Sequence, residues 1–547
     1  MKHQKKVVKN FILACVLGTI CLTILGCSNT DEKHQGLVIT TIEVPFINCE
    51  DDFDIDDMDA VELQFINNGA VPYIDVTTYI DMIDAMLHYD VSDMVIDEQR
   101  ITIEYNPVVY QTLNPPDAED PNYRQSMIID FEEDTVTVSS YLFFIYQGIE
   151  HVASETDIIQ ITDVAITEGK SVEIPFYEYG FDFIIEETDT EQNYLIPFHV
   201  ASLLFNYSTL FKTYYNGDEI YGGGLCIYRE EVVRSSSFNG LDIPDDIRLA
   251  SFDVFTIALD YFSSMKQARQ IESYRDLFMK QLPTIRYADS DDYYMEFTKL
   301  LYQVDDLHAD LPAAGYYSSA PLETLPPFPS WYRPIRKAYY NTAGTYRSTF
   351  FSLFDGTSFP PTVRLLDEER IAVIHIYQFT ETMPDEFKTY IDNLPPTVEH
   401  VVIDLSMNGG GNVNAIFRLL GYMTNQPIVY NNGIAIDGSF RTFIIEVEED
   451  AYDYDWYILT SPVTFSAANI ATLLAQENGI ATIIGESSSG GASPIESILL
   501  PCGFSHTISG NYTFYSTSGT AELGVPVDIE MLNLWDDNEL IDLINQP

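Results

Sequence analysis

The C-terminal part of the chain alternates short apolar strands with helical stretches, and this alternation restricts the fold more than any other feature. Apolar runs too short for helices predict buried strands, and apolar residues at helical spacing predict helices between them. Strands that alternate with helices form a largely parallel sheet covered by those helices. We therefore predict an α/β fold after about residue 365, with strands at 371–376, 401–405 and 481–484 and helices at 414–423 and 467–476.

Length and local pattern divide the rest of the chain. Its 547 residues suffice for roughly two to four domains. Helical spacing occurs over 247–266 and 293–304, and a dense set of prolines between 312 and 334 predicts a linker or extended loop. We predict four parts: a leader at 1–27, an N-terminal α+β module at 28–240, a helical segment at 241–330 and the α/β domain at 331–547.

The N-terminal module offers no catalytic group of residues, so its role stays open. Strand-like composition predicts strands at 61–66, 101–105 and 135–146. Residues 71–87 and 195–211 each begin with a short proline-containing strand and continue as a helix. This shared layout fits a divergent internal repeat and fits chance equally well.

The first 27 residues have the layout of an export signal. Four lysines precede residue 11, and residues 11–25 are nearly all apolar but too short to span a bilayer comfortably. The run ends in Gly26-Cys27, which resembles a bacterial lipobox, in which cleavage before Cys27 leaves its thiol to carry a lipid. The alternative is an uncleaved anchor helix. Both place the body of the protein outside the cytoplasmic membrane.

Composition excludes some classes of function. Acidic residues outnumber basic ones by 84 to 27, and a net charge of -57 repels nucleic-acid backbones. The cysteines that would remain after processing besides Cys27, which are Cys49, Cys226 and Cys502, are too few and too scattered for a disulfide framework, although one bridge is open. The acidic run at 50–59 lacks the glycine and glutamate spacing of a calcium loop, so we expect a solvated surface and no metal.

Two segments of the α/β domain could carry chemistry. Three consecutive glycines, 409–411, follow the strand at 401–405 and could direct backbone amides at a developing oxyanion, or form a plain tight turn. Ser466 stands just before the helix at 467–476. A serine there is a good helix N-cap, and the same position suits a nucleophile because the local field is positive and amides are free.

A nucleophilic serine needs a base. No lysine or arginine follows Arg441, so a lysine downstream of Ser466 cannot serve, and the base must be a histidine or a more distant lysine. His308 lies where a helix gives way to a loop, which suits either a functional residue or a cation at a helix C-terminus. The other histidines outside the N-terminal module are His375, His400 and His506.

Four motifs in one order resemble the S41 serine peptidases, a family that includes the C-terminal processing proteases, the tricorn core protease and interphotoreceptor retinoid-binding protein. The resemblance covers about 245–547, and its motifs are 404–411, 464–469, 485–491 and 522–528. It implies a crotonase/ClpP-like protease core of repeated β-β-α units. It also implies hydrolysis of protein or peptide substrates without a cofactor.

Position by position, the resemblance makes Ser466 the nucleophile and the amides of Gly410 and Ala467 the oxyanion hole. The lysine base of the processing proteases is lost, because Gly491 stands at its place. The tricorn-like branch uses a histidine from an Asp-x-His sequence and a glutamate, which here are His308 and Glu522. The implied chemistry is attack by Ser466, proton transfer by His308 and orientation of the system by Glu522.

Three departures weaken the match. Ser406 replaces a frequent arginine, Asn469 a frequent glutamate, and Leu307 stands where the tricorn branch has an assisting serine. We also see no insert of the PDZ type between His308 and the strand at 371–376. The sequence therefore predicts a lipid-anchored serine endopeptidase, with a non-catalytic binding lipoprotein on the same scaffold as the alternative. A third reading makes the N-terminal module an adhesion or sensing domain.

Overall fold

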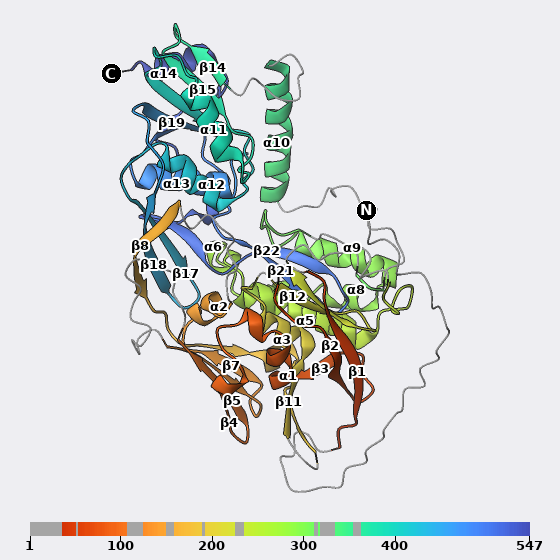
Figure 1. Cartoon of the computed structure of the whole chain (residues 1–547). Helices are drawn as coiled ribbons and strands as arrows, with labels where there is room; N and C mark the ends of the chain where they lie inside the picture. The colour runs from red at the N-terminus through yellow and green to blue at the C-terminus, as the bar shows by residue number, and fades with distance from the viewer. Residues whose placement is uncertain are drawn as a thin grey trace, which may run out of the picture.

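The computed structural model describes residues 36–50, 53–106, 124–148, 158–188, 192–209, 211–224, 235–310, 315–317, 334–353 and 363–546 (Figure 1). The predicted leader with Cys27, and Cys226, lie outside these ranges, as does most of the proline-rich stretch. Within the described part, no helix combines the length and apolar character needed to cross a membrane.

The N-terminal part contains two sheets. A seven-stranded sheet has the order β10-β11-β3-β2-β1-β13-β12, and all its neighbours are antiparallel except β1 and β13. A five-stranded antiparallel sheet has the order β4-β5-β6-β7-β9. The strands are β1 (Ile39–Asn48), β2 (Met58–Ile66), β3 (Pro72–Asp75), β4 (Met94–Ile96), β5 (Arg100–Tyr105), β6 (Gln125–Asp130), β7 (Thr135–Val138), β9 (Val172–Pro175), β10 (Ile184–Glu187), β11 (Gln192–Pro197), β12 (Phe211–Tyr215) and β13 (Ile220–Gly224).

The two stretches with a shared layout pack against each other. Each strand runs directly into its helix, β3 into α1 (Val76–Met82) and β11 into α3 (Phe198–Phe205), and β3 pairs antiparallel with β11. The rings of Tyr79 and Phe198 meet across the helices at 5.6 Å. The strand predicted at 135–146 is half wrong: β7 ends at Val138 and α2 (Leu142–Tyr146) follows, because its aromatic residues pack into the core as a helix.

The predicted helical segment is a set of short helices. They are α5 (Asp245–Tyr261), α6 (Met265–Ala268), α7 (Tyr274–Phe278), α8 (Leu282–Tyr287) and α9 (Ser290–Leu301). A further helix, α10 (Pro334–Leu353), follows the proline-rich stretch and was not predicted. Its first residue is a proline, which the first position of a helix tolerates because that N–H has no intrahelical acceptor.

The C-terminal part has the predicted α/β core. Its six-stranded sheet has the order β14-β15-β16-β19-β20-β25, in which only β14 is antiparallel to its neighbour. The elements are β14 (Val363–Leu366), β15 (Ile371–His375), α11 (Met383–Asp392), β16 (His400–Asp404), α12 (Val413–Gly421), β19 (Asp455–Thr460), α13 (Ala467–Glu477), β20 (Thr482–Gly485), β25 (Ile529–Glu530) and α14 (Asp537–Ile544). The predicted strands and helices of this part are confirmed within a few residues.

Two elements join this core to the N-terminal part. β8 (Ile159–Thr167) pairs with β18 (Ser439–Val447) at the edge of the sheet β24-β23-β17-β18-β8, whose other strands are β17 (Ile428–Ile434), β23 (Thr513–Ser516) and β24 (Gly519–Thr520). The hairpin of β21 (Ile495–Leu499) and β22 (Ser505–Ser509) buries Ile498, Phe504 and Ile508 in the large core of the N-terminal and helical parts. The four predicted parts remain a prediction.

Candidate active site

The glycine loop and the turn before α13 are tied together by hydrogen bonds. The Thr464 hydroxyl donates to the Leu405 carbonyl at 2.8 Å, and the Phe465 amide donates to the Asn408 carbonyl at 3.1 Å. Both segments follow neighbouring parallel strands, β16 and β19, so they emerge at the same edge of the sheet. The carboxyl ends of such strands are where open α/β sheets carry their sites.

Ser466 has a backbone conformation that few residues other than glycine adopt. Its φ is 55° and its ψ is -126°, and the turn is held by a hydrogen bond from its amide to the Gly490 carbonyl at 2.9 Å. It occupies the N-cap position of α13, but its side chain makes no capping hydrogen bond. Strain of this kind concentrates at functional sites, and here it turns the hydroxyl away from the helix amides.

The Ser466 hydroxyl meets His308. The distance from Ser466 Oγ to His308 Nε2 is 3.1 Å, although 158 residues separate them in sequence. The imidazole is 6% exposed, and the Phe465 ring packs against it with centroids 4.7 Å apart. The structure therefore brings two of the sequence-predicted residues to hydrogen-bonding distance.

The other face of the imidazole meets a serine that the sequence did not indicate. His308 Nδ1 lies 3.0 Å from Ser509 Oγ, at the end of β22. Ser509 Oγ donates to Asp306 Oδ1 at 2.9 Å, and the Ser509 amide donates to Asp306 Oδ2 at 2.7 Å. Asp306 Oδ1 also accepts from the His308 amide at 2.9 Å. No local pattern predicts Ser509, because 201 residues separate it from His308.

Glu522 lies near this group but bonds elsewhere. Its Oε2 accepts from the Ala492 amide, the Ser493 hydroxyl and the Thr513 hydroxyl at 2.9, 3.1 and 3.0 Å. Among the described residues, no hydrogen bond joins it to His308. Complete burial, and next the negative charge of Asp306, raise the pKa of the Glu522 carboxyl above its ordinary value, while His308 opposes the rise.

The Gly410 amide, predicted for the oxyanion hole, has a hydrogen-bond partner of its own. The Gly410 amide donates to the Asn408 side-chain oxygen at 2.8 Å, and the Asn408 amide group donates to the Ile376 carbonyl at 3.0 Å. Gly410 has a φ of 115°, and a Cβ there would stand 2.7 Å from Ser466 Cβ and 3.0 Å from the Ala467 amide nitrogen. Only glycine lets the loop approach the serine this closely.

The other three histidines outside the N-terminal module contact other residues. His375 pairs with Asp404 at 3.3 Å, and His400 pairs with Asp455 at 3.2 Å. His506 is fully buried against Phe255, and burial lowers its pKa to about 3. His308 is thus the histidine that the fold places at the serine.

Two of the three residues that depart from the family pattern make hydrogen bonds within the domain. Ser406 donates to Asp404 Oδ1 at 2.6 Å and accepts from the Trp535 indole at 3.1 Å. The Asn469 amide group donates to the Ala521 carbonyl at 3.1 Å, and its oxygen accepts from the Ser488 hydroxyl. Within the described ranges, no cluster of three or more histidine, cysteine or acidic side chains could hold a metal ion.

The helix α10 passes beside the site. The ring of Tyr339 contacts Phe465 with centroids 5.8 Å apart, and Phe465 in turn contacts His308. Further along, Tyr346 donates a hydrogen bond to Glu486, and Phe350 packs on His375 at 5.0 Å. Figure 1 shows this helix standing alongside the C-terminal part.

The family comparison identifies the domain. The model of peptidase family S41 matches residues 370–531. This segment is an S41 peptidase domain. It contains Ser466, the glycine loop, Ser509 and Glu522, whereas His308 and Asp306 come from the preceding chain. The match supports a peptidase function, as the motifs predicted, and it lies on the α/β core.

Solved structures show weaker likeness. A Parabacteroides merdae structure assigned as a peptidase is 16% identical, with TM-score 0.42, over 55% of this chain and 97% of its own. Mature CPAF is 10% identical, with TM-score 0.38, over 55% and 96%. The tricorn protease is 13% identical, with TM-score 0.31, over 93% and 54%. At these values the likeness does not extend to a comparison of individual site residues. No curated protein matches the sequence.

Proposed function

We propose that this protein is a serine endopeptidase in which Ser466 is the nucleophile and His308 the general base. The observation that carries the proposal is the contact of 3.1 Å between Ser466 Oγ and His308 Nε2 at a strained turn in an S41 domain. Ser466 attacks the scissile carbonyl while His308 takes its proton. His308 then returns the proton to the leaving amine, and water repeats the sequence to release the acyl group.

The tetrahedral intermediate needs hydrogen-bond donors beside Ser466. The Ala467 amide follows the nucleophile directly, and the Gly410 amide comes from the adjoining loop. Because Gly410 donates to Asn408 in the free protein, we propose that the oxyanion shares this donor or displaces the Asn408 side chain. Glu522 supports the site from the neighbouring 492–493 and 513 segments.

The location is also part of the proposal. The lysine-rich start, the apolar run and Gly26-Cys27 support a lipid anchor on the extracytoplasmic face of the cell membrane. Metabolic labelling with a palmitate analogue tests this. Incorporation by the natural protein and none by Cys27→Ala is expected. Equal incorporation by both would contradict a lipid at Cys27.

The activity is tested with a fluorophosphonate probe, which reacts covalently with an activated serine, and with a peptide library read by mass spectrometry. The full chain in mild detergent is compared with Ser466→Ala, His308→Ala and the control His400→Gln, which changes a histidine paired with Asp455 on the far end of β16. Labelling and cleavage by the natural protein and the control, with loss in the other two, are expected. Labelling that survives Ser466→Ala would refute this nucleophile.

One observation favours a second function. Gly410 already donates to an internal acceptor, and an occupied oxyanion-hole donor suits a scaffold that binds peptides without cleaving them. A folded protein that binds library peptides, cleaves none and resists the probe would establish this alternative.

A further inference from the structure

We infer that Asp306, acting through the hydroxyl of Ser509, is the group that positions His308 and fixes its tautomer, in place of Glu522. This inference rests on the proposed function. Asp306 and Ser509 do not touch Ser466, so they are positioning residues and His308 remains the base.

The direction of each proton follows from counting donors. A serine hydroxyl has one proton to give, and Ser509 gives it to Asp306 Oδ1 at 2.9 Å. Its oxygen can therefore only accept at His308 Nδ1, 3.0 Å away, so Nδ1 must carry the ring proton. The lone pair of a neutral imidazole is then on Nε2, where Ser466 Oγ stands at 3.1 Å. This is the tautomer that a general base requires.

The carboxylate is rigidly held for this task. Asp306 is 1% exposed, and its two oxygens accept from the Ser509 amide, the Ser509 hydroxyl and the His308 amide. One residue, Ser509, thus engages both oxygens of Asp306 and the imidazole. The strand β22 is itself held to the His308 segment, because Thr507 Oγ1 donates to the His308 carbonyl at 2.6 Å and the Thr507 amide donates to the Asp310 carbonyl at 2.9 Å.

Glu522 is poorly placed for the same role. Its described hydrogen bonds go to Ala492, Ser493 and Thr513, which join three segments of the S41 domain to one another. The hairpin that carries Ser509 is buried in the core of the N-terminal and helical parts. The hydrogen bonds from Asp306 through Ser509 to His308 therefore link that core to the nucleophile. The hydrogen bonds of Glu522 remain within the S41 domain.

The test measures the tautomer and the reactivity of the same variants. The full chain is labelled with ring-¹⁵N histidine, the His308 signals are identified by their loss in His308→Gln, and probe labelling is followed as a function of pH. Ser509→Ala keeps the backbone amide that Asp306 accepts from, so it removes only the relay. Asp306→Asn offers an amide donor to Ser509, whose proton then turns toward Nδ1 and forces the wrong tautomer.

We expect the natural protein to show a protonated Nδ1 and Ser509→Ala and Asp306→Asn to show a mixed or reversed tautomer. The maximal labelling rate should fall about 10- to 100-fold in Ser509→Ala and about 10²- to 10⁴-fold in Asp306→Asn, with little change in probe affinity.

Two further variants separate positioning from simple destabilisation. Thr507→Val removes a hydrogen bond to the His308 backbone from the same strand, so it should lower stability without changing the tautomer. Glu522→Gln should leave the tautomer unchanged. An unchanged tautomer in Asp306→Asn and Ser509→Ala, with a shifted one in Glu522→Gln, would overturn the inference while leaving the proposed function intact. Probe labelling that survives both Ser466→Ala and His308→Ala would overturn the proposed function instead.

Discussion

Replacing His506 by phenylalanine should make the protein more resistant to acid. His506 is fully buried against the Phe255 ring, and neither ring nitrogen has a hydrogen-bond partner in the part of the chain that the structure describes. Burial lowers its pKa from 6.5 to about 3. Below pH 6.5 the unfolded chain takes up a proton on this histidine that the folded protein does not accept until about pH 3. The free energy of unfolding is therefore unaffected above pH 6.5 and decreases as the pH falls toward 3.

The size of the effect follows from this shift. Each pH unit below 6.5 costs about 1.4 kcal/mol of unfolding free energy, so one such histidine costs about 2 kcal/mol at pH 5. His199, which is also buried and whose pKa is also lowered to about 3, adds a similar loss. The substitution should therefore remove about half of the decrease in unfolding free energy that the two histidines cause at low pH. The larger phenylalanine adds a packing cost of about 1–3 kcal/mol, but that cost does not depend on pH.

The assay is urea unfolding of the natural protein and His506→Phe at pH 8 and pH 5. The lower value stays above the isoelectric point of about 4.1, where precipitation would interfere. The free-energy difference between variant and natural protein should move by about 2 kcal/mol in favour of the variant between the two values. An equal difference at both would refute the reasoning, because it would mean that His506 titrates in the folded state as it does in water.

Three other perturbations have clear expected outcomes. Ser466→Ala should change the unfolding free energy by less than about 0.5 kcal/mol in urea, because the side chain makes no capping bond, while probe labelling disappears. Gly410→Ala should lower the probe-labelling rate by about 10²-fold or more without unfolding the protein, because its Cβ would press on Ser466 at a φ of 115°. Lys212→Met should cost about 3–5 kcal/mol in urea at pH 8, because it leaves Glu496 buried without the cation 3.7 Å away, and Lys212→Met/Glu496→Leu should recover most of that loss.

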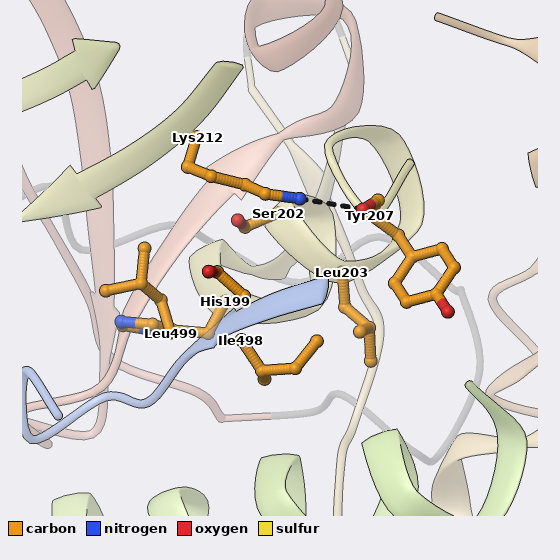
Figure 2. A pocket seen from close by; sticks show the side chains of 8 residues that line it. His199, Ser202, Leu203, Tyr207, Lys212, Ile498 and Leu499 are labelled. Carbon is orange, nitrogen blue, oxygen red and sulfur yellow. Dashed lines mark hydrogen bonds between the residues drawn. The ribbon is translucent and has the colours of Figure 1, made fainter. Parts of the chain in front are cut away.

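Lys212 lies beside a small cavity of about 10 Å³ between α3 and β21, which is room for about one water (Figure 2). Its ammonium donates to the carbonyls of Asn206 and Tyr207, and burial raises the pKa of Glu496 to about 7. The Lys212→Met penalty should therefore shrink at pH 5, where Glu496 takes up a proton. A penalty independent of pH would contradict this. A decrease of about 1 kcal/mol in the unfolding free energy of Ser466→Ala, as for a lost helix cap, would contradict the first prediction. A normal labelling rate in Gly410→Ala would contradict the second.

The core of the fold could be predicted from sequence because its signals are local. The strand that ends at His375, the strand that ends at Asp404 and the helix after Ser466 were each expected from a few consecutive residues, and each is present. The segment at 135–146 was half mispredicted because aromatic residues suit both a strand and a buried helix, and tertiary packing decides between them. The helix α10 was missed because prolines precede it.

The sequence by itself determined the nucleophile candidate, the histidine candidate and the absence of a lysine base after Arg441, since motif order and residue identity carry those features. The tertiary structure decided which groups touch. In the folded chain His308 contacts Ser466, and the Asn408 side chain accepts a hydrogen bond from the Gly410 amide. Ser509 lies between His308 and Asp306. A hydrogen bond depends on where the folded chain brings two atoms together. When 201 residues separate the partners, only the packing of the β21–β22 hairpin against the helices supplies that information.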